Sequence, residues 1–99
     1  MILYKIRLII SGRVQGVFFR VFVREEAKNL NINKGFVRNL YSGEVEVLAY
    51  HKDRDVLEAL IDRCKIGPPQ SNVVDIVTHW ESVQDQDPEY QEFKIASTK

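Results

Sequence analysis

A glycine-bearing turn between two different hydrophobic patterns constrains this chain more than any other feature. Residues 4–10 alternate apolar and polar side chains, which predicts a half-buried β-strand. Residues 21–30 instead repeat apolar side chains at helical spacing. The connection between them contains Gly12 and Gly16 and ends at Arg20. A turn of this kind aims backbone N–H groups into one concavity beside the positive end of a helix, so it predicts a site for a phosphate-sized anion.

The length and the charge balance limit what such a site can serve. With 99 residues the chain is long enough for one hydrophobic core, and we expect a single domain covering residues 1–99. Lys and Arg number 14 and Asp and Glu number 14, which gives a formal net charge of +0. Broad binding to nucleic acid or to an anionic membrane needs a clustered basic surface, so we expect neither partner. A small anionic ligand remains compatible with this composition.

The cysteine count and the apolar runs indicate the compartment. Cys64 is the single cysteine, so an internal disulfide and a thiolate-rich zinc site are both excluded. The N-terminal residues carry charge too early for a signal peptide. No apolar run approaches the roughly 20 residues that span a bilayer. We therefore expect a cytoplasmic protein in which Cys64 is an inert core thiol.

The remainder of the chain alternates strand patterns with one more helix. The predicted strands, separated by turn residues, cover residues 36–41, 44–50, 73–80 and 92–96. The second helix begins after Asp53, a favourable N-cap, and stops at Gly67-Pro68-Pro69. Val74, Ile76, Thr78 and Trp80 are expected to share one face of their strand. A polar loop at residues 84–89 precedes the last strand.

This element order predicts a fold that brings two chemical groups together. A βαββαβ order plus a short terminal strand is typical of the ferredoxin-like α+β sandwich, with an antiparallel sheet and two helices on one face. The first two strands then run parallel with the third between them, so their ends lie at one sheet edge, about 9–10 Å apart. Asn39 lies near the end of the second strand and is expected to face the glycine turn. Residues 67–72 are a weaker candidate for the rim of the same site.

Two segments of the chain resemble the acylphosphatase family. The family pattern G-x-V-Q-G-V-x-F-R is matched throughout residues 12–20. A second pattern, G-aromatic-V-x-N followed by G-x-V-E, is matched at residues 35–39 and 43–46. The resemblance implies hydrolysis of the carboxyl–phosphate bond of an acylphosphate to a carboxylate and inorganic phosphate. It implies no metal and no other cofactor.

The same resemblance assigns roles within the site. Arg20 would bind the phosphate, and Asn39 would position the attacking water. The backbone N–H groups that would line the cradle belong to Gln15, Gly16, Val17, Phe18 and Phe19. For the Gln15 side chain we favour a bracing role in the turn over a substrate contact.

Two alternatives belong to other classes of protein. A non-catalytic phosphate-binding or regulatory module of ferredoxin-like fold would keep the anion site and lack the hydrolysis. An RNA-binding sheet module would need exposed aromatic side chains on the open face of the sheet. That face is instead expected to carry Lys5, Arg7, Glu44 and Glu46. We expect a monomer, because no large apolar stripe is left over once the core is assigned.

Overall fold

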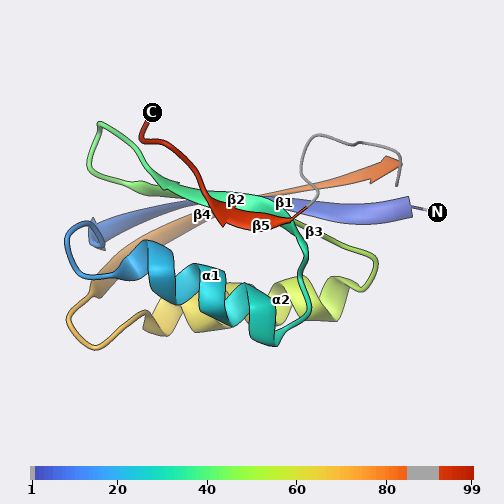
Figure 1. Ribbon diagram of the computed structural model, residues 1–99, viewed down its shortest axis with the longest axis horizontal. Helices are drawn as coiled ribbons and strands as arrows, with labels where there is room; N and C mark the ends of the chain where they lie inside the picture. Colours follow the sequence, from blue (N-terminus) through green and yellow to red (C-terminus); the bar gives the residue numbers. More distant parts are fainter. Residues whose placement is uncertain (1, 85–91) are drawn as a thin grey trace.

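Two helices, Phe19–Asn29 (α1) and Arg54–Ile66 (α2), cover one face of a five-stranded sheet in the computed structural model, which describes residues 2–84 and 92–99 (Figure 1). The strands are Ile2–Arg13 (β1), Lys34–Asn39 (β2), Val45–His51 (β3), Asn72–Gln84 (β4) and Phe93–Ile95 (β5). The element order predicted from the sequence is confirmed. Residues 85–89 of the predicted polar loop lie outside the described residues. Neither α1 nor α2 is long and apolar enough to cross a membrane.

The sheet has the strand order β4-β1-β3-β2-β5. Because β3 pairs antiparallel with both β1 and β2, these two strands run parallel to each other, as predicted. The ferredoxin-like α+β fold is therefore confirmed. One refinement is that β5 pairs parallel with β2, so the sheet is mixed at this edge. The physical reason is that β5 reverses the direction of β4, which itself runs opposite to β2.

The main core fills the space between the sheet and the two helices. It includes alternate residues of β1 and residues at helical spacing in α1 and α2, namely Ile6, Leu8, Ile10, Phe19, Val23, Ala27, Leu57, Leu60 and Cys64. Burial, and secondarily the negative charge of Glu26, raises the pKa of the Cys64 thiol to about 12. The predicted core position of this cysteine is confirmed, and a thiol with so high a pKa is expected to be unreactive.

A β-bulge changes which residues of β4 face the core. The register of β1 against β4 shifts between Ser11 and Gly12, and Val74 is the extra residue. Val73 packs against the core, whereas Val74 is 72% exposed. The prediction that Val74 shares a face with Ile76 and Trp80, which pack against the core, is therefore wrong, because a bulge reverses the side to which the following residues point. Gly12 has φ 120°, and a Cβ there would overlap the Asn72 carbonyl oxygen.

The open face of the sheet carries an ionic cluster. The Glu46 carboxylate is buried and accepts hydrogen bonds from Arg7 and from Arg38 Nε, the latter at 2.6 Å. Lys5 lies on the same face, with its Nζ 5.8 Å from the centre of the Tyr50 ring. These positions agree with the predicted charged face. Glu44 precedes β3, and its carboxylate accepts a hydrogen bond from Ser42 Oγ in the β2–β3 turn.

Two aromatic rings on the open face are buried. Phe36 and Tyr50 pack with Leu3 and Leu48 in a second, smaller apolar cluster. The Arg38 guanidinium covers Phe36, with 4.6 Å between its Cζ and the ring centre. An RNA-binding sheet needs rings that bases can stack on, and neither of these two is accessible.

Candidate active site

The glycine turn leads into a helix whose N-terminus has no side-chain cap. Phe18 is the N-cap residue, with φ 65° and ψ 24° in the left-handed region, and its side chain makes no capping hydrogen bond. Gly16 also has a positive φ, of 76°. The first turn of α1 contains no acidic residue. The first N–H groups of the helix and its positive dipole end are therefore left for an external anion.

A pocket of about 300 Å³ lies at this helix end and contains both predicted functional side chains. Arg20, from the first turn of α1, and Asn39, the last residue of β2, line it together. The volume is at the lower end of the range for small-ligand sites. The topology thus brings together two side chains that are 19 positions apart in the sequence, as the strand order predicts.

Three of the five predicted cradle residues line the pocket, and the other two do not. Gly16, Phe18 and Phe19 line the pocket, and Phe18 is 78% exposed. Val17 is buried in the core, and neither Val17 nor Gln15 is among the lining residues. Residues 67–72 do not line the pocket either. They lead into β4, which pairs with β1 on the side away from β2. The predicted rim there is therefore wrong.

The Asn39 side chain presents an unused acceptor. Its Oδ1 is buried and has no hydrogen-bond partner among the described residues. Buried polar atoms are nearly always satisfied by protein or by ordered water. The backbone of Asn39 is well fixed, because it pairs with Val45 in β3 and its carbonyl accepts a hydrogen bond from Lys99 N at 3.1 Å. A positioned acceptor without a protein partner is suited to binding a water molecule.

The Gln15 side chain joins the two halves of the pocket. Its Nε2 donates to the Leu40 carbonyl at 2.8 Å and to the Glu44 carbonyl at 2.9 Å. Leu40 follows Asn39 directly, so this contact connects the glycine turn to the strand end that carries the amide. The bracing role predicted for the Gln15 side chain is confirmed.

Sequence reasoning missed three apolar residues of the pocket lining. Val14 and Val21 flank the cradle, and Ile95 comes from β5. The alternation of Phe93 and Ile95 predicts a strand, but so short a pattern does not indicate which strand it pairs with. In the structure β5 pairs with β2, which places Ile95 at the pocket.

The chain segment after β5 runs alongside β2 toward the pocket. Ala96 N donates to the Val37 carbonyl at 2.9 Å, and Tyr41 N donates to the Lys99 carbonyl at 2.9 Å. Within residues 2–84 and 92–99, no three His, Cys, Asp or Glu side chains group as metal ligands would. The fold and the pocket thus define a small α+β sandwich in which an uncapped helix N-terminus, one arginine and one amide meet.

Comparison with known proteins identifies the family. The acylphosphatase family model matches residues 6–95. An acylphosphatase of Dehalococcoides mccartyi strain CBDB1 is 41% identical over 91 residues, which are 91% of this chain and 94% of the relative. The crystal structure of the Bacillus subtilis acylphosphatase superposes with a TM-score of 0.80 at 35% identity, covering 97% of this chain and 99% of that one. The acylphosphatase structure from Coxiella burnetii gives 0.79 at 37% identity, with coverages of 95% and 93%.

The chain belongs to the acylphosphatase family. The resemblance found in the two sequence motifs is confirmed, and both motifs lie inside the matched range.

Proposed function

We propose that this protein is an acylphosphatase, which hydrolyses the carboxyl–phosphate bond of acylphosphates to a carboxylate and inorganic phosphate. Relatives that bear this name match it over nearly their whole length. The observation that carries the mechanism is the pocket that Arg20 and Asn39 line together, with the Asn39 Oδ1 left without a hydrogen-bond partner among the described residues. The pocket opens at an uncapped helix N-terminus, which favours a phosphate group.

Phosphate binding falls to Arg20 and to backbone N–H groups. The guanidinium holds two phosphate oxygens in a bidentate arrangement, and N–H groups of Gln15, Gly16, Val17, Phe18 and Phe19 hold the third. A cation in the first turn of a helix is unfavourable by itself, because it faces the positive dipole end. A bound dianion removes this repulsion, which explains why an arginine is tolerated at that place.

Hydrolysis proceeds by attack of one water molecule on phosphorus. Asn39 accepts a hydrogen bond from the water and orients it, but an amide is not basic enough to deprotonate it. A P–O bond to water forms as the P–O bond to the acyl oxygen breaks, and the water proton passes to the phosphate or to bulk solvent. The carboxylate leaving group is stable at neutral pH, so no general acid is needed. Catalysis then rests on positioning and on charge stabilisation, and no metal is required.

The proposal extends to the setting of the enzyme. We place it in the cytoplasm as a monomer, with residues 1–99 acting as one domain. The acylphosphate substrate and the inorganic phosphate product are its small-molecule partners, and it has no nucleic-acid or membrane partner. The competing proposal, a phosphate-binding module without catalysis, keeps Arg20 and gives Asn39 no task.

Hydrolysis of benzoyl phosphate, followed with and without EDTA, tests this function. We expect the wild-type protein to be active in both conditions. Arg20→Ala and Asn39→Ala should remain folded and lose nearly all activity, while the surface variants Lys65→Ala and Asn29→Ala should match the wild type. A folded wild-type protein that binds phosphate without turnover would establish the non-catalytic module instead. Loss of activity in EDTA would exclude the metal-free mechanism.

A further inference from the structure

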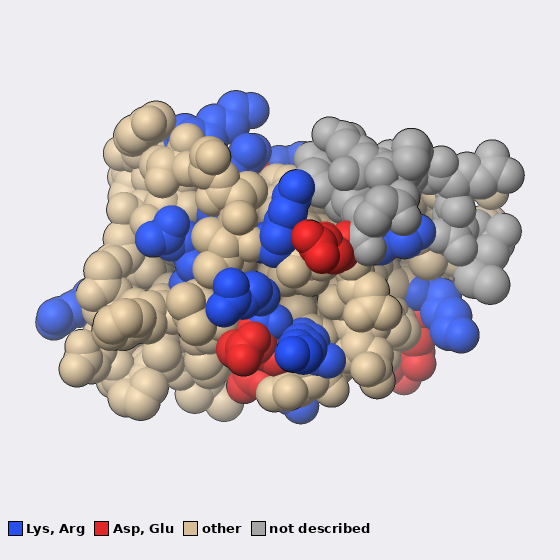
Figure 2. All heavy atoms as spheres, viewed as in Figure 1, with Lys and Arg blue, Asp and Glu red and all other residues tan. Residues whose placement is uncertain are grey.

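A second and larger hollow lies farther along α1 than the proposed active site. It has a volume of about 690 Å³ and lies between α1 and β5. Figure 2 shows Lys and Arg side chains gathered with a few acidic ones on this face, where α1 and β5 lie next to each other. We name the hollow the α1–β5 furrow; its lining residues are Arg24, Glu25, Lys28, Ile32, Asn33, Glu92 and Phe93.

The residue spacing along the two walls aligns the furrow with the phosphate pocket. Arg20 lines the pocket, and Arg24 and Lys28 follow at intervals of four residues, so all three share one face of α1. Ile95 lines the pocket and Phe93 lines the furrow two residues earlier on β5. Four helix residues advance about 6 Å and two strand residues advance about 7 Å, so the spacing of lining residues is similar on the two walls.

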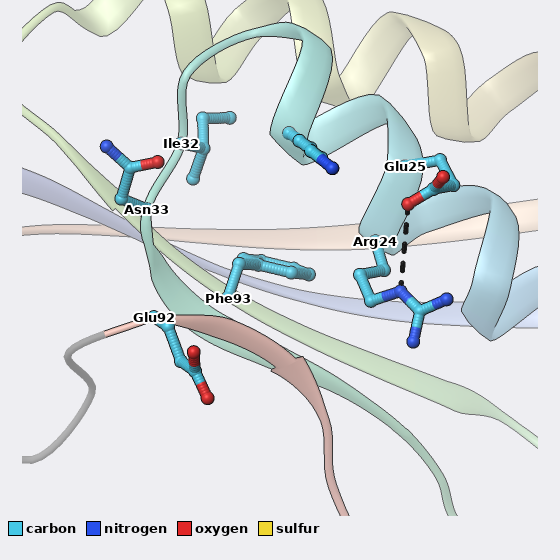
Figure 3. Close-up of a pocket in the computed structure, with 7 residues that line it drawn as sticks. Arg24, Glu25, Ile32, Asn33, Glu92 and Phe93 are labelled. Carbon is cyan, nitrogen blue, oxygen red and sulfur yellow. Dashed lines mark ion pairs between the residues drawn. The ribbon is translucent and has the colours of Figure 1, made fainter.

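The furrow combines an apolar floor with cations on the helix side. Ile32 is buried, and the Phe93 ring lies between α1 and β5 (Figure 3). The Arg24 Nε and the Glu25 carboxylate are 3.7 Å apart, and both side chains are about half exposed, so this pair is weak and leaves Arg24 available. Lys28 makes no ion pair with any of residues 2–84 or 92–99. Glu92 lines the furrow from the opposite wall, and its carboxylate points away from α1 (Figure 3).

We propose that the α1–β5 furrow holds the acyl part of the substrate and selects acylphosphates that carry a second carboxylate. This inference rests on the proposed phosphatase function. With the phosphate at Arg20, a four- or five-carbon diacid chain extends about one helical turn, which brings its free carboxylate opposite Arg24 and within reach of Lys28. The methylene groups of the chain lie against Phe93 and Ile32. Glu92 on the other wall repels that carboxylate and weakens the preference without reversing it.

Succinyl phosphate and butyryl phosphate provide a matched pair of substrates. Their acyl chains are equally long, but succinyl phosphate ends in a carboxylate and butyryl phosphate ends in a methyl group. We expect the wild-type kcat/KM to be about three- to tenfold higher for succinyl phosphate, the effect of one or two partly exposed ion pairs. Added salt should reduce this ratio, because exposed charges are screened.

Substitutions in the furrow test which residues produce the preference. Lys28→Ala and Arg24→Ala should each lower the succinyl-to-butyryl ratio, and the double variant should bring it to about one. Lys28→Glu should invert the ratio, whereas Glu92→Gln should raise it. Lys65→Ala, which removes an exposed cation from α2, should leave the ratio and both rates at wild-type values.

The outcomes separate this inference from the function on which it rests. Turnover of butyryl phosphate together with a wild-type ratio of one or less would overturn the furrow alone. A ratio above one that persists in the Arg24→Ala, Lys28→Ala double variant would overturn it as well. Failure to hydrolyse either compound would overturn both the phosphatase function and the furrow.

Discussion

The two walls of the phosphate pocket are held in place by different means. The wall that carries Arg20 is fixed by backbone conformation, with Gly16 and Phe18 both at positive φ immediately before the helix. The wall that carries Asn39 is the end of a strand, fixed by pairing with β3 and by a hydrogen bond from Lys99 N. The difference suggests a division of labour. A rigid backbone cradle suits phosphate binding, while a separately held amide suits the placement of a water molecule.

Arg20→Ala should have the largest effect, because it removes the only guanidinium in the pocket lining of the described residues. We expect kcat/KM for benzoyl phosphate to fall at least ~10²–10³-fold, the usual cost of losing a preorganised charge-stabilising group. The affinity for inorganic phosphate should fall as well, roughly tenfold or more, from the loss of charge-assisted hydrogen bonds. Steady-state kinetics and calorimetry measure the two effects. Lys65→Ala serves as the control, and unchanged phosphate affinity in Arg20→Ala would remove the arginine from the cradle.

Asn39→Ala should come next and should differ in kind. We expect kcat to fall about 10²-fold while KM and phosphate affinity stay near their wild-type values, because the amide contacts the water and not the phosphate. Full kinetic profiles of this variant and of the control Asn29→Ala check the prediction. A rise in KM with kcat preserved would assign Asn39 to substrate binding.

Gln15→Leu should show how strongly the two walls are coupled. The Leu40 carbonyl keeps a hydrogen bond from Gly43 N and the Glu44 carbonyl keeps one from Leu40 N, so stability should fall by only about 1 kcal/mol. We expect kcat to fall about tenfold with phosphate affinity retained, since Asn39 loses its fixed distance from the cradle. Denaturation curves, calorimetry and kinetics separate these effects from those of the exposed control Gln70→Ala. Wild-type kcat in Gln15→Leu would show that the walls are positioned independently.

The last and smallest effect concerns the reactivity of Cys64, which belongs to the core and lines neither wall of the pocket. Its pKa of about 12 leaves only about 10⁻⁴ of the thiol ionised at pH 8, so a thiol reagent should label it slowly and at the rate of unfolding. The folded pKa lies above the usual 9.0, so the unfolded thiol ionises first as the pH rises. The stabilisation is complete below pH 9 and is lost toward pH 12. Rapid labelling of the native protein at pH 8 would contradict this account.

The sequence predicted most of the fold because its periodicities are strong and its turns are well marked. The strand–turn–helix unit around Gly12 and the order of the elements were enough for the ferredoxin-like topology. That topology then predicted that Arg20 and Asn39 would meet. The position of Val74 was missed, because a bulge depends on pairing between β1 and β4 that local alternation does not reveal. Ile95 was missed for the same reason, since three residues of strand do not specify a partner.

The details of the cradle were less predictable than its location. Glycines at positions 12 and 16 indicate positive φ. The left-handed conformation of Phe18 could not be predicted, because this conformation is usually adopted by glycine or asparagine and rarely by phenylalanine. The brace from Gln15 was predicted as a role, but its acceptors on Leu40 and Glu44 depend on how the β2–β3 turn packs. Contacts between loops follow from tertiary structure and not from local pattern.

Binding of inorganic phosphate to wild-type protein, Arg20→Ala and Asn39→Ala tests the division of labour most directly. Calorimetry at one pH and one salt concentration gives three dissociation constants that need no assumption about the chemical step. We predict that Asn39→Ala binds phosphate as the wild type does, while Arg20→Ala binds it at least about tenfold more weakly. Equal weakening in both variants, or none in either, would contradict the assignment of phosphate to one wall and water to the other.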